Sequence, residues 1–295
     1  MNGWIIYNGA LKFKKFHLLV ESLVAESKKK GIQLEAIPNS ELLPMFHSDG
    51  TQGLKSLRSL NEPDFIIFWD KDIYLAKHLE AMGYRLFNRR VAIENCDHKA
   101  YMHLQMAQDT IRVPKTIVGP FTFHQHELSG EYIDYIFEEL GSEVILKEVF
   151  GSFGMQVYKF NNKEDLIHKM KELDGRDFIL QEPIKSSFGR DIRVTIIGNQ
   201  VIGGMKREFA TDFRANITLG GRGELVELTE EQEKLALKAH RSLGLDFSGV
   251  DLLFDEDDRP IVCEVNSNVN YLSFEQVSGV NVSRLLLDYI VGEMP

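Results

Sequence analysis

The stretches GVDLLF (residues 249–254) and IVCEVN (residues 261–266) flank the polar loop DEDDRP (residues 255–260), and they decide how this sequence is interpreted. Two apolar segments on either side of a short loop rich in turn-forming residues are typical of a β-hairpin. Side chains alternate between the two faces of a strand. Each segment is therefore expected to present one apolar face and one face that carries its polar groups.

The polar groups of this hairpin meet if Phe254 pairs with Ile261. In that register Asp251 lies directly opposite Glu264, and Asn266 shares their face. Two carboxylates opposite each other have Cβ atoms about 5 Å apart and repel each other. A cation is therefore expected between them, and Mg²⁺ accepts carboxylate and amide oxygens at about 2.0–2.1 Å. We predict a metal site formed by Asp251, Glu264 and Asn266, with Mg²⁺ as the preferred ion and Mn²⁺ as the alternative.

The neighbouring residues of the hairpin bear on this prediction. Gly249 lies opposite Asn266 in the same register, and its missing side chain leaves room for a ligand. Leu253 and Val262 are expected between the polar residues, which favours a partly covered cleft over the alternative of a solvated polar face. The opposite, apolar face is expected to consist of Leu252, Phe254, Ile261, Cys263 and Val265.

The composition is that of an ordinary globular chain of 295 residues, with 43% hydrophobic and 26% charged residues. The formal net charge of −10 argues against binding of nucleic acid or another polyanion. Cys96 and Cys263 are too few for a disulfide framework, and the N-terminus lacks the pattern of a secretory signal. No apolar run has the length of a membrane-spanning helix. We expect a cytoplasmic protein without a membrane partner, and a homo-oligomer is compatible with the sequence.

The chain divides into two kinds of pattern. Residues 1–95 alternate strands and helices as a parallel α/β unit does, and the chain after Pro114 is typical of antiparallel α+β structure. Strands are predicted over residues 4–7, 65–69, 85–87, 144–149, 155–160, 178–181, 192–197, 200–206, 250–254 and 261–265. Helices are predicted over residues 13–30, 74–82, 97–107, 229–243 and 281–291, with Thr229 and Gln232 as a capping box.

A glycine-rich stretch, GSFG (residues 151–154), lies between two of the predicted strands. Glycines allow backbone N–H groups to close over phosphate oxygens, and a plain hairpin turn is the alternative. Lys147, on the preceding strand, offers a positive charge for a phosphate. Lys99 opens a predicted helix, and its alternative interpretation is an ordinary surface lysine.

A second hairpin is indicated by the turn residues Gly198-Asn199. A two-residue loop would pair Asp191 with Lys206 and Arg193 with Gly204. Asp191, Arg193 and Lys206 would then share one face of the hairpin. This concentration of basic groups in an acidic chain indicates either structural ion pairs or an anionic ligand that faces the acidic hairpin.

Taken together, these segments resemble the ATP-grasp superfamily, and within it the RimK-type carboxylate–amine ligases. The resemblance extends from Cys96 to the C-terminus, and its motifs occur in one order. They are DHK (97–99), VPKT (113–116), VILK (144–147), GSFG (151–154), QEPI (181–184), GRDIR (189–193), FRAN (213–216), GVD (249–251) and EVNSN (264–268). The chain departs from the family pattern at SNVN (267–270), where the family usually has a Pro-Gly turn. This departure leaves the metal ligands intact and the amine substrate open.

The resemblance implies an α/β and α+β ATP-grasp fold, in which a Rossmann-like pre-ATP-grasp domain precedes two α+β lobes that enclose ATP. The implied domains are residues 1–95, residues 96–186 with a glycine-rich lid, and residues 187–295 with the metal site.

The resemblance also implies roles for single residues, which would include a hinge that reads the adenine edge and an aspartate near the ribose. The residues in contact with ATP would be Lys99, Lys147, Gly151, Ser152, Phe153, Gly154, Gln181, Glu182, Pro183, Ile184, Asp191 and Arg193. The catalytic residues would be Lys206, Arg214 and Asn216, and the metal ligands would be Asp251, Glu264 and Asn266.

The implied activity is ATP- and Mg²⁺-dependent ligation of a small-molecule or peptide carboxylate to an amine, through an acyl phosphate and with release of ADP. Two alternatives stay open at the level of the sequence. One is an ATP-grasp kinase that phosphorylates a small molecule, and the other is a non-catalytic ATP-binding regulatory module.

Overall fold

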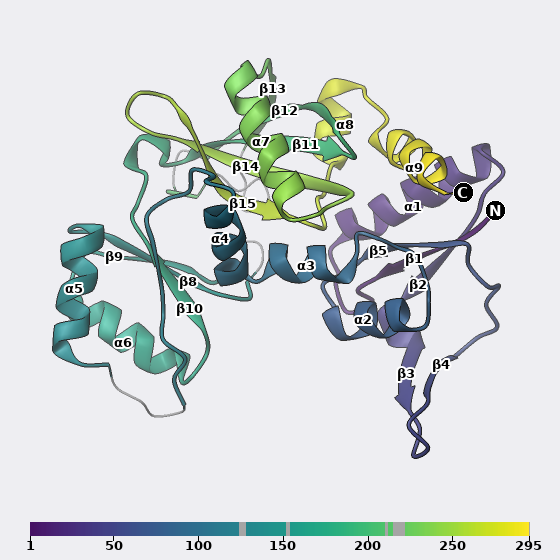
Figure 1. Cartoon of the computed structure of the whole chain (residues 1–295). Helices are drawn as coiled ribbons and strands as arrows, with labels where there is room; N and C mark the ends of the chain where they lie inside the picture. The colour runs from purple at the N-terminus through teal and green to yellow at the C-terminus, as the bar shows by residue number, and fades with distance from the viewer. Residues whose placement is uncertain (124–127, 152–153, 210–211, 215–221, 295) are drawn as a thin grey trace.

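The computed structural model describes residues 1–123, 128–151, 154–209, 212–214 and 222–294, and it contains three main β-sheets (Figure 1). The expected α/β and α+β character is confirmed, since one sheet is parallel and the other two are antiparallel. No helix in the described ranges has the length and apolarity needed to span a bilayer.

The first sheet is parallel and has the strand order β2-β1-β5-β6. Its strand β5 (Phe65–Trp69) is buried at every residue, because α1 (Lys14–Lys29) and α2 (Ile73–Ala81) belong to hydrophobic clusters that together involve both faces of the sheet. Beside it lies the small antiparallel sheet that projects from this unit in Figure 1. The remaining elements are β1 (Asn2–Tyr7), β2 (Gln33–Pro38), η1 (Asn39–Glu41), β3 (Leu42–Phe46), β4 (Gln52–Ser56) and β6 (Leu86–Phe87).

Two short helices lead from the first sheet to the second. They are α3 (Arg90–Asp97) and α4 (Lys99–Gln108), separated by the extended residue His98. The His98 side chain accepts a hydrogen bond from the N–H of Tyr101 and so caps α4. The helix predicted over residues 97–107 therefore corresponds to α4. The prediction missed α3, which has only eight residues and too few turns to show a clear apolar period.

The second sheet is antiparallel, with the order β7-β10-β8-β9. Helices α5 (Gly130–Leu140) and α6 (Lys163–Leu173) pack against it through a hydrophobic cluster and lie on its outer side in Figure 1. The strands are β7 (Thr116–Val118), β8 (Val144–Glu148), β9 (Val157–Phe160) and β10 (Phe178–Gln181). The sequence analysis predicted the last three strands but neither helix.

The third sheet is also antiparallel, with the order β13-β12-β11-β14-β15. Helix α7 (Glu230–Ser242) covers one face through a cluster that includes Ala236 and Val250, and its predicted capping box between Thr229 and Gln232 is confirmed. The strands are β11 (Arg190–Ile197), β12 (Gln200–Glu208), β13 (Arg222–Val226), β14 (Phe247–Phe254) and β15 (Pro260–Asn266), and the short helix η2 (Lys185–Ser187) precedes them.

The C-terminal helices α8 (Leu272–Ser278) and α9 (Val282–Glu293) return to the first sheet. Helix α9 packs along α1, where the hydroxyl oxygens of Ser22 and Ser283 are 2.8 Å apart, and the two termini lie near each other in Figure 1. Each expected domain holds one main sheet, but α3 crosses the 95/96 boundary and α9 crosses over to the first domain. The division into three domains therefore stays a prediction.

The sequence analysis expected the missing side chain of Gly249 to leave room for a ligand. The structure shows that this room is filled by other residues. A Cβ built at this position would lie 2.5 Å from Cγ2 of Val269 and 3.3 Å from Cδ of Arg193. Val269 is buried in the cluster that joins the third sheet to the first. Gly249 therefore allows a close approach between the strand and the segment that follows β15.

We expect Gly249→Ala to lower the free energy of unfolding by about 1–3 kcal/mol, because the added methyl group overlaps a buried valine. Gly292→Ala is the matched control, since nothing lies within 4 Å of a Cβ at that helical position. It should stabilise the protein by up to about 1 kcal/mol through helix propensity. Urea unfolding followed by circular dichroism measures both variants, and equal stabilities would contradict the assignment.

Candidate functional site

The acidic hairpin brings its polar residues together as predicted, although it closes differently. Asp251 pairs with Glu264, and Gly249 pairs with Asn266. Phe254, however, pairs with Pro260 rather than with Ile261, so the predicted pairing at the end of the hairpin loop was wrong. A bulge between Asp251 and Leu252 restores the predicted register at the polar end.

The bulge also changes which side chains face the site. Cys263, placed on the apolar face by the sequence analysis, lines the cavity beside Glu264, and Val262 is fully buried in the hydrophobic cluster under α7. Both predictions of orientation were therefore wrong, whereas Leu253 does line the cavity. The Nζ atom of Lys147 lies 3.9 Å from Sγ of Cys263, so the bulge brings β15 into contact with β8.

The second hairpin does not have the predicted register. A bulge between Thr195 and Ile196 shifts the pairing, so that Asp191 pairs with Arg207 and Ile192 pairs with Lys206. Arg207 lines the cavity, and Lys206 does not. Lys206 instead forms ion pairs with Glu208 at 2.6 Å and with Glu224 at 3.7 Å. The catalytic role predicted for Lys206 is corrected accordingly, and Arg207 takes its place at the site.

Two arginines and two aspartates form a buried network on this face. Arg193 holds Asp251 with two hydrogen bonds of 2.7 Å each. Arg207 donates from Nε to Asp191 at 2.6 Å, and its NH2 group lies 2.9 Å from Asp251. Burial opposes ionisation of Asp251, but the two guanidinium groups outweigh it and lower the pKa of its carboxyl. Burial raises the pKa of Asp191 although Arg207 pairs with it.

These side chains line a cavity of 690 Å³ between the three sheets. Lys99 and Lys147 both line it, and each is only 8% exposed, so the surface interpretation of Lys99 is wrong. The Nζ atom of Lys99 donates to the carbonyl oxygens of Gly151 at 3.3 Å and Val149 at 3.4 Å. Burial lowers the pKa of the Lys99 ammonium.

The glycine-rich stretch and the arginine predicted to be catalytic meet at one side of the cavity. Gly151, Gly154 and Arg214 all line it. Arg214 donates to the carbonyl oxygen of Gly154 and is held by Asp212 through ion-paired hydrogen bonds. The other predicted residues of this group, Ser152, Phe153 and Asn216, lie outside the described residues.

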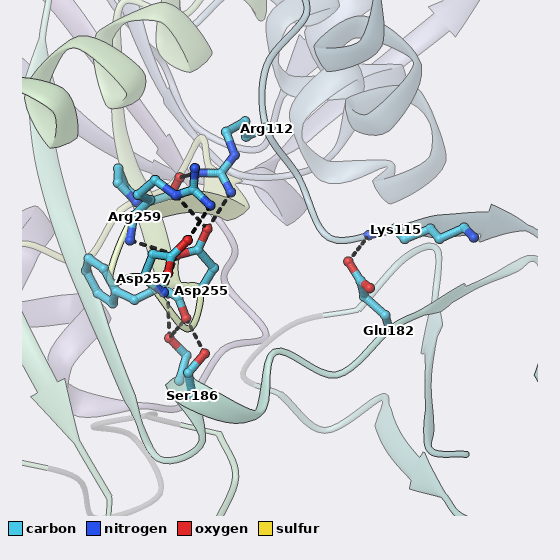
Figure 2. A network of polar contacts seen from close by, with 10 residues as sticks. Arg112, Lys115, Glu182, Ser186, Asp255, Asp257 and Arg259 are labelled. Atoms are coloured by element: carbon cyan, nitrogen blue, oxygen red, sulfur yellow. Dashed lines mark hydrogen bonds and ion pairs between the residues drawn. The ribbon is translucent and has the colours of Figure 1, made fainter. Parts of the chain in front are cut away.

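The predicted hinge is held at the cavity by the segment before β7. Gln181, Glu182 and Ile184 line the cavity, and Pro183 is not among its lining residues. Figure 2 shows Oε1 of Glu182 accepting a hydrogen bond of 2.7 Å from the N–H of Lys115. The N–H of Glu182 donates in turn to the Lys115 carbonyl oxygen at 3.0 Å. This two-point contact fixes the course of the chain as it leaves β10.

The tip of the acidic hairpin is tied to the hinge region by a polar network on its outer side (Figure 2). Arg112 donates to Asp255 at 2.7 Å, and Arg259 pairs with both Asp255 and Asp257. Ser186 of η2 donates to the carbonyl oxygen of Phe254 at 2.6 Å. The second and third sheets are therefore held together next to the cavity.

The first sheet contributes a wall of the cavity that the sequence analysis missed. Its lining residues include Asn8, Lys15, Asp70 and Lys71, which follow the carboxyl ends of β1 and β5 or begin α1. A signal was available in the sequence, because Asp70 directly follows the buried strand predicted over residues 65–69. Ligands of open α/β sheets bind at the carboxyl ends of such strands.

The donor set of Asp251, Glu264 and Asn266 has the chemistry of a magnesium site, but Arg193 and Arg207 already bind both carboxylate oxygens of Asp251, which would have to exchange those contacts to hold the ion. All three line the cavity, and they supply the carboxylate and amide oxygens that a hard cation prefers. Glu264 is paired through its backbone with Asp251, and its carboxylate has no hydrogen bond or ion pair with another described residue, so the carboxylate is available. Within the described ranges no three histidine, cysteine or acidic side chains cluster for a metal, and the proposed set needs only two acidic groups and one amide.

Comparisons with known proteins find relatives over most of the chain. The model of the RimK-like ATP-grasp domain family matches residues 96–290. N-acetylaspartylglutamate synthase A of Homo sapiens is 36% identical over 231 residues, which cover 77% of this chain and 57% of the relative. The ligase LysX of Saccharolobus solfataricus, named for α-aminoadipate and LysW, is 26% identical over 285 residues, which cover 91% of this chain and 95% of the relative.

Among solved structures, D-cycloserine synthetase DcsG has a TM-score of 0.75 at 14% identity, and the match covers 100% of both chains. An ATP-grasp protein with a RimK domain from Sphaerobacter thermophilus has a TM-score of 0.71 at 19% identity, and the match covers 97% of this chain and 98% of that one. The ATP-grasp fold expected from the sequence is therefore confirmed. The present chain spans little more than half of the human relative's length.

The register of the second hairpin predicts a large difference between two adjacent residues. Arg207→Met leaves two buried carboxylates without their shared cation, which should lower the free energy of unfolding by about 3–5 kcal/mol. Lys206→Met, the matched control, removes only partly exposed ion pairs and should cost less than about 1 kcal/mol. Denaturant unfolding of the two variants measures this difference. A greater loss for Lys206→Met would contradict the observed register.

Proposed function

This chain belongs to the RimK-like ATP-grasp family, and we propose that it is an ATP- and magnesium-dependent ligase that joins a carboxylate to an amine. The observation that carries the proposal is the shared cavity. Two buried lysines, two paired arginines and the carboxylate and amide oxygens of Asp251, Glu264 and Asn266 line one cavity between three sheets. Such a cavity supplies positive charge for a polyphosphate together with ligands for its cation.

The lining residues support a division of roles. Lys99 and Lys147 would contact the phosphates of ATP as point charges. The hinge from Gln181 to Ile184 would hold the adenine, because its course is fixed by Lys115. Asp191 was expected near the ribose, but both of its carboxylate oxygens bind Arg207. We therefore assign Asp191 the role of orienting Arg207.

The reaction would proceed in two balanced steps. A carboxylate oxygen of the first substrate attacks the γ-phosphorus, the bond to the β-phosphate oxygen breaks, and ADP leaves. The neutral amine nitrogen then attacks the acyl carbon, the bond to the phosphate oxygen breaks, and the nitrogen loses a proton to the departing phosphate. Lys147, Arg193 and Arg214 would stabilise negative charge as it shifts among the phosphoryl oxygens. Bound Mg²⁺ would supply Lewis-acid stabilisation of the same oxygens.

The amine substrate is proposed to be an acidic amino acid. Both relatives described above are named for one, glutamate in the first case and α-aminoadipate in the second. The carboxylate substrate is proposed to be a small molecule or a peptide. The cytoplasmic location expected from the sequence is supported by Cys96 and Cys263, which are both free thiols.

An ADP-release assay tests the proposed function. Pools of carboxylates are combined with L-glutamate, L-α-aminoadipate or hydroxylamine, which traps an acyl phosphate as a hydroxamate, and the products are identified by mass spectrometry. We expect ADP together with an amide or a hydroxamate. A stable phosphorylated product would instead indicate a kinase, and ATP binding without turnover would indicate a regulatory module.

The metal assignment predicts that Glu264→Gln lowers magnesium-dependent ADP release by more than about 100-fold, because it removes a charged ligand. The stability of the variant should hardly change, since the carboxylate of Glu264 has no hydrogen-bond or ion-pair partner among the described residues and the substitution leaves the backbone pairing with Asp251 intact. Asp251→Asn is a poorer test because it also breaks the pairs with Arg193 and Arg207. Glu256→Gln, in the exposed loop of the same hairpin, is the matched control. Unchanged turnover in Glu264→Gln would refute the assignment.

A further inference from the structure

The first sheet places two polar residues at its topological switch point. The chain leaves β1 towards β2 on one side and later forms β5 on the other side of β1. Asn8 and Asp70 follow the carboxyl ends of β1 and β5, whose last residues pair with each other. The crevice at such a point is where open parallel sheets bind ligands. Both residues line the cavity described above.

Asp70 is a buried carboxylate that is only half satisfied. Its Oδ1 accepts hydrogen bonds from the N–H of Lys71 at 2.7 Å and from Nδ2 of Asn8 at 3.3 Å. Its Oδ2 is buried and has no hydrogen-bond partner in the described structure. The residue is 4% exposed, and the ammonium of Lys71, the next residue in the sequence, is bound to Asp97 at 2.9 Å. Burial raises the pKa of the Asp70 carboxyl.

A second acceptor without a partner lies in the segment that follows β15 and lines the same cavity. Oδ1 of Asn268 is buried, lacks a hydrogen-bond partner in the described part of the chain, and belongs to a side chain that lines the cavity. The preceding residue, Ser267, donates to the carboxylate of Asp97 at 3.1 Å, and Asp97 binds Lys71. This chain of contacts ties the segment of Asn268 to the loop of Asp70.

The two free acceptors define the ligand they would take. An unpaired buried carboxylate oxygen and an unpaired amide oxygen both require hydrogen-bond donors, and the carboxylate also requires positive charge. A protonated primary amine supplies both, since it carries three donors and a single positive charge. A carboxylate or phosphate group would be repelled by Asp70.

We propose that Asp70 and Asn268 form an ammonium subsite that receives the amino group of the amine substrate, with Asn8 positioning Asp70. The bound ammonium loses one proton to solvent before its nitrogen attacks the acyl carbon. The subsite rests on the proposed ligase function and adds the residues that would select the amine. It also assigns a role to the stretch at residues 267–270, where the sequence departs from the family pattern.

Asp70→Asn tests the subsite because it keeps the shape of the side chain and removes its charge. We expect the KM for L-glutamate or L-α-aminoadipate to rise by about 30- to 100-fold, as for loss of a charged hydrogen bond. ADP release with hydroxylamine, which is neutral and needs no ammonium subsite, should stay within about 3-fold of wild type. Asp64→Asn, the same change at the exposed amino end of β5, is the matched control and should alter neither reaction.

Other outcomes separate the subsite from the ligase function. Equal losses with the amino acids and with hydroxylamine would show a merely structural role for Asp70 and overturn the subsite, as would unchanged kinetics. If wild type releases no ADP with any acceptor, the ligase function fails. In that case the fluorescence of Trp69, which lines the cavity, is used to measure binding of the same amino acids. Saturable binding that Asp70→Asn abolishes supports the subsite, and absence of binding to wild type overturns it.

Discussion

The structure depends most on the buried network in which Arg193 and Arg207 share Asp251, while Arg207 also holds Asp191. The network joins β11, β12 and β14, the three central strands of the third sheet. Isolated charges in such a position would be costly, so each side chain requires the others to be in register. The network therefore links the register of the sheet to the shape of the cavity. The same groups that keep the strands aligned present charge to a ligand.

Residues from all three main sheets line the cavity, so no single motif forms it. The second sheet contributes Lys147 and the hinge, the third contributes the paired charges, and the first contributes Asp70 and its neighbours. Helix α9 packs on α1 and so couples the first sheet to the third. In the proposed function the first sheet would select a second substrate, while the other two sheets would hold the nucleotide.

Two β-bulges explain why the sequence predicted one hairpin site and missed the other. In the acidic hairpin the assumed loop was one residue too long, and the bulge beside Asp251 offset that error, so Asp251 still faces Glu264. In the second hairpin the loop was predicted correctly, and an unforeseen bulge exchanged Lys206 for Arg207. A bulge inserts one extra residue into a strand, and the pattern of apolar and polar residues in the sequence does not reveal where. Every side chain beyond the bulge then lies on the opposite face from the one predicted.

The sequence by itself determined the family, the order of the motifs, most of the strands, and the residue types that can hold a metal and a polyphosphate. These follow from local periodicity and from spacing along the chain, which the amino acids specify directly. Only the tertiary structure decided that Lys99 is buried, that Arg207 faces the cavity, and that Asn268 borders it. Those facts depend on packing between segments that lie far apart in the sequence, and no local pattern encodes such packing.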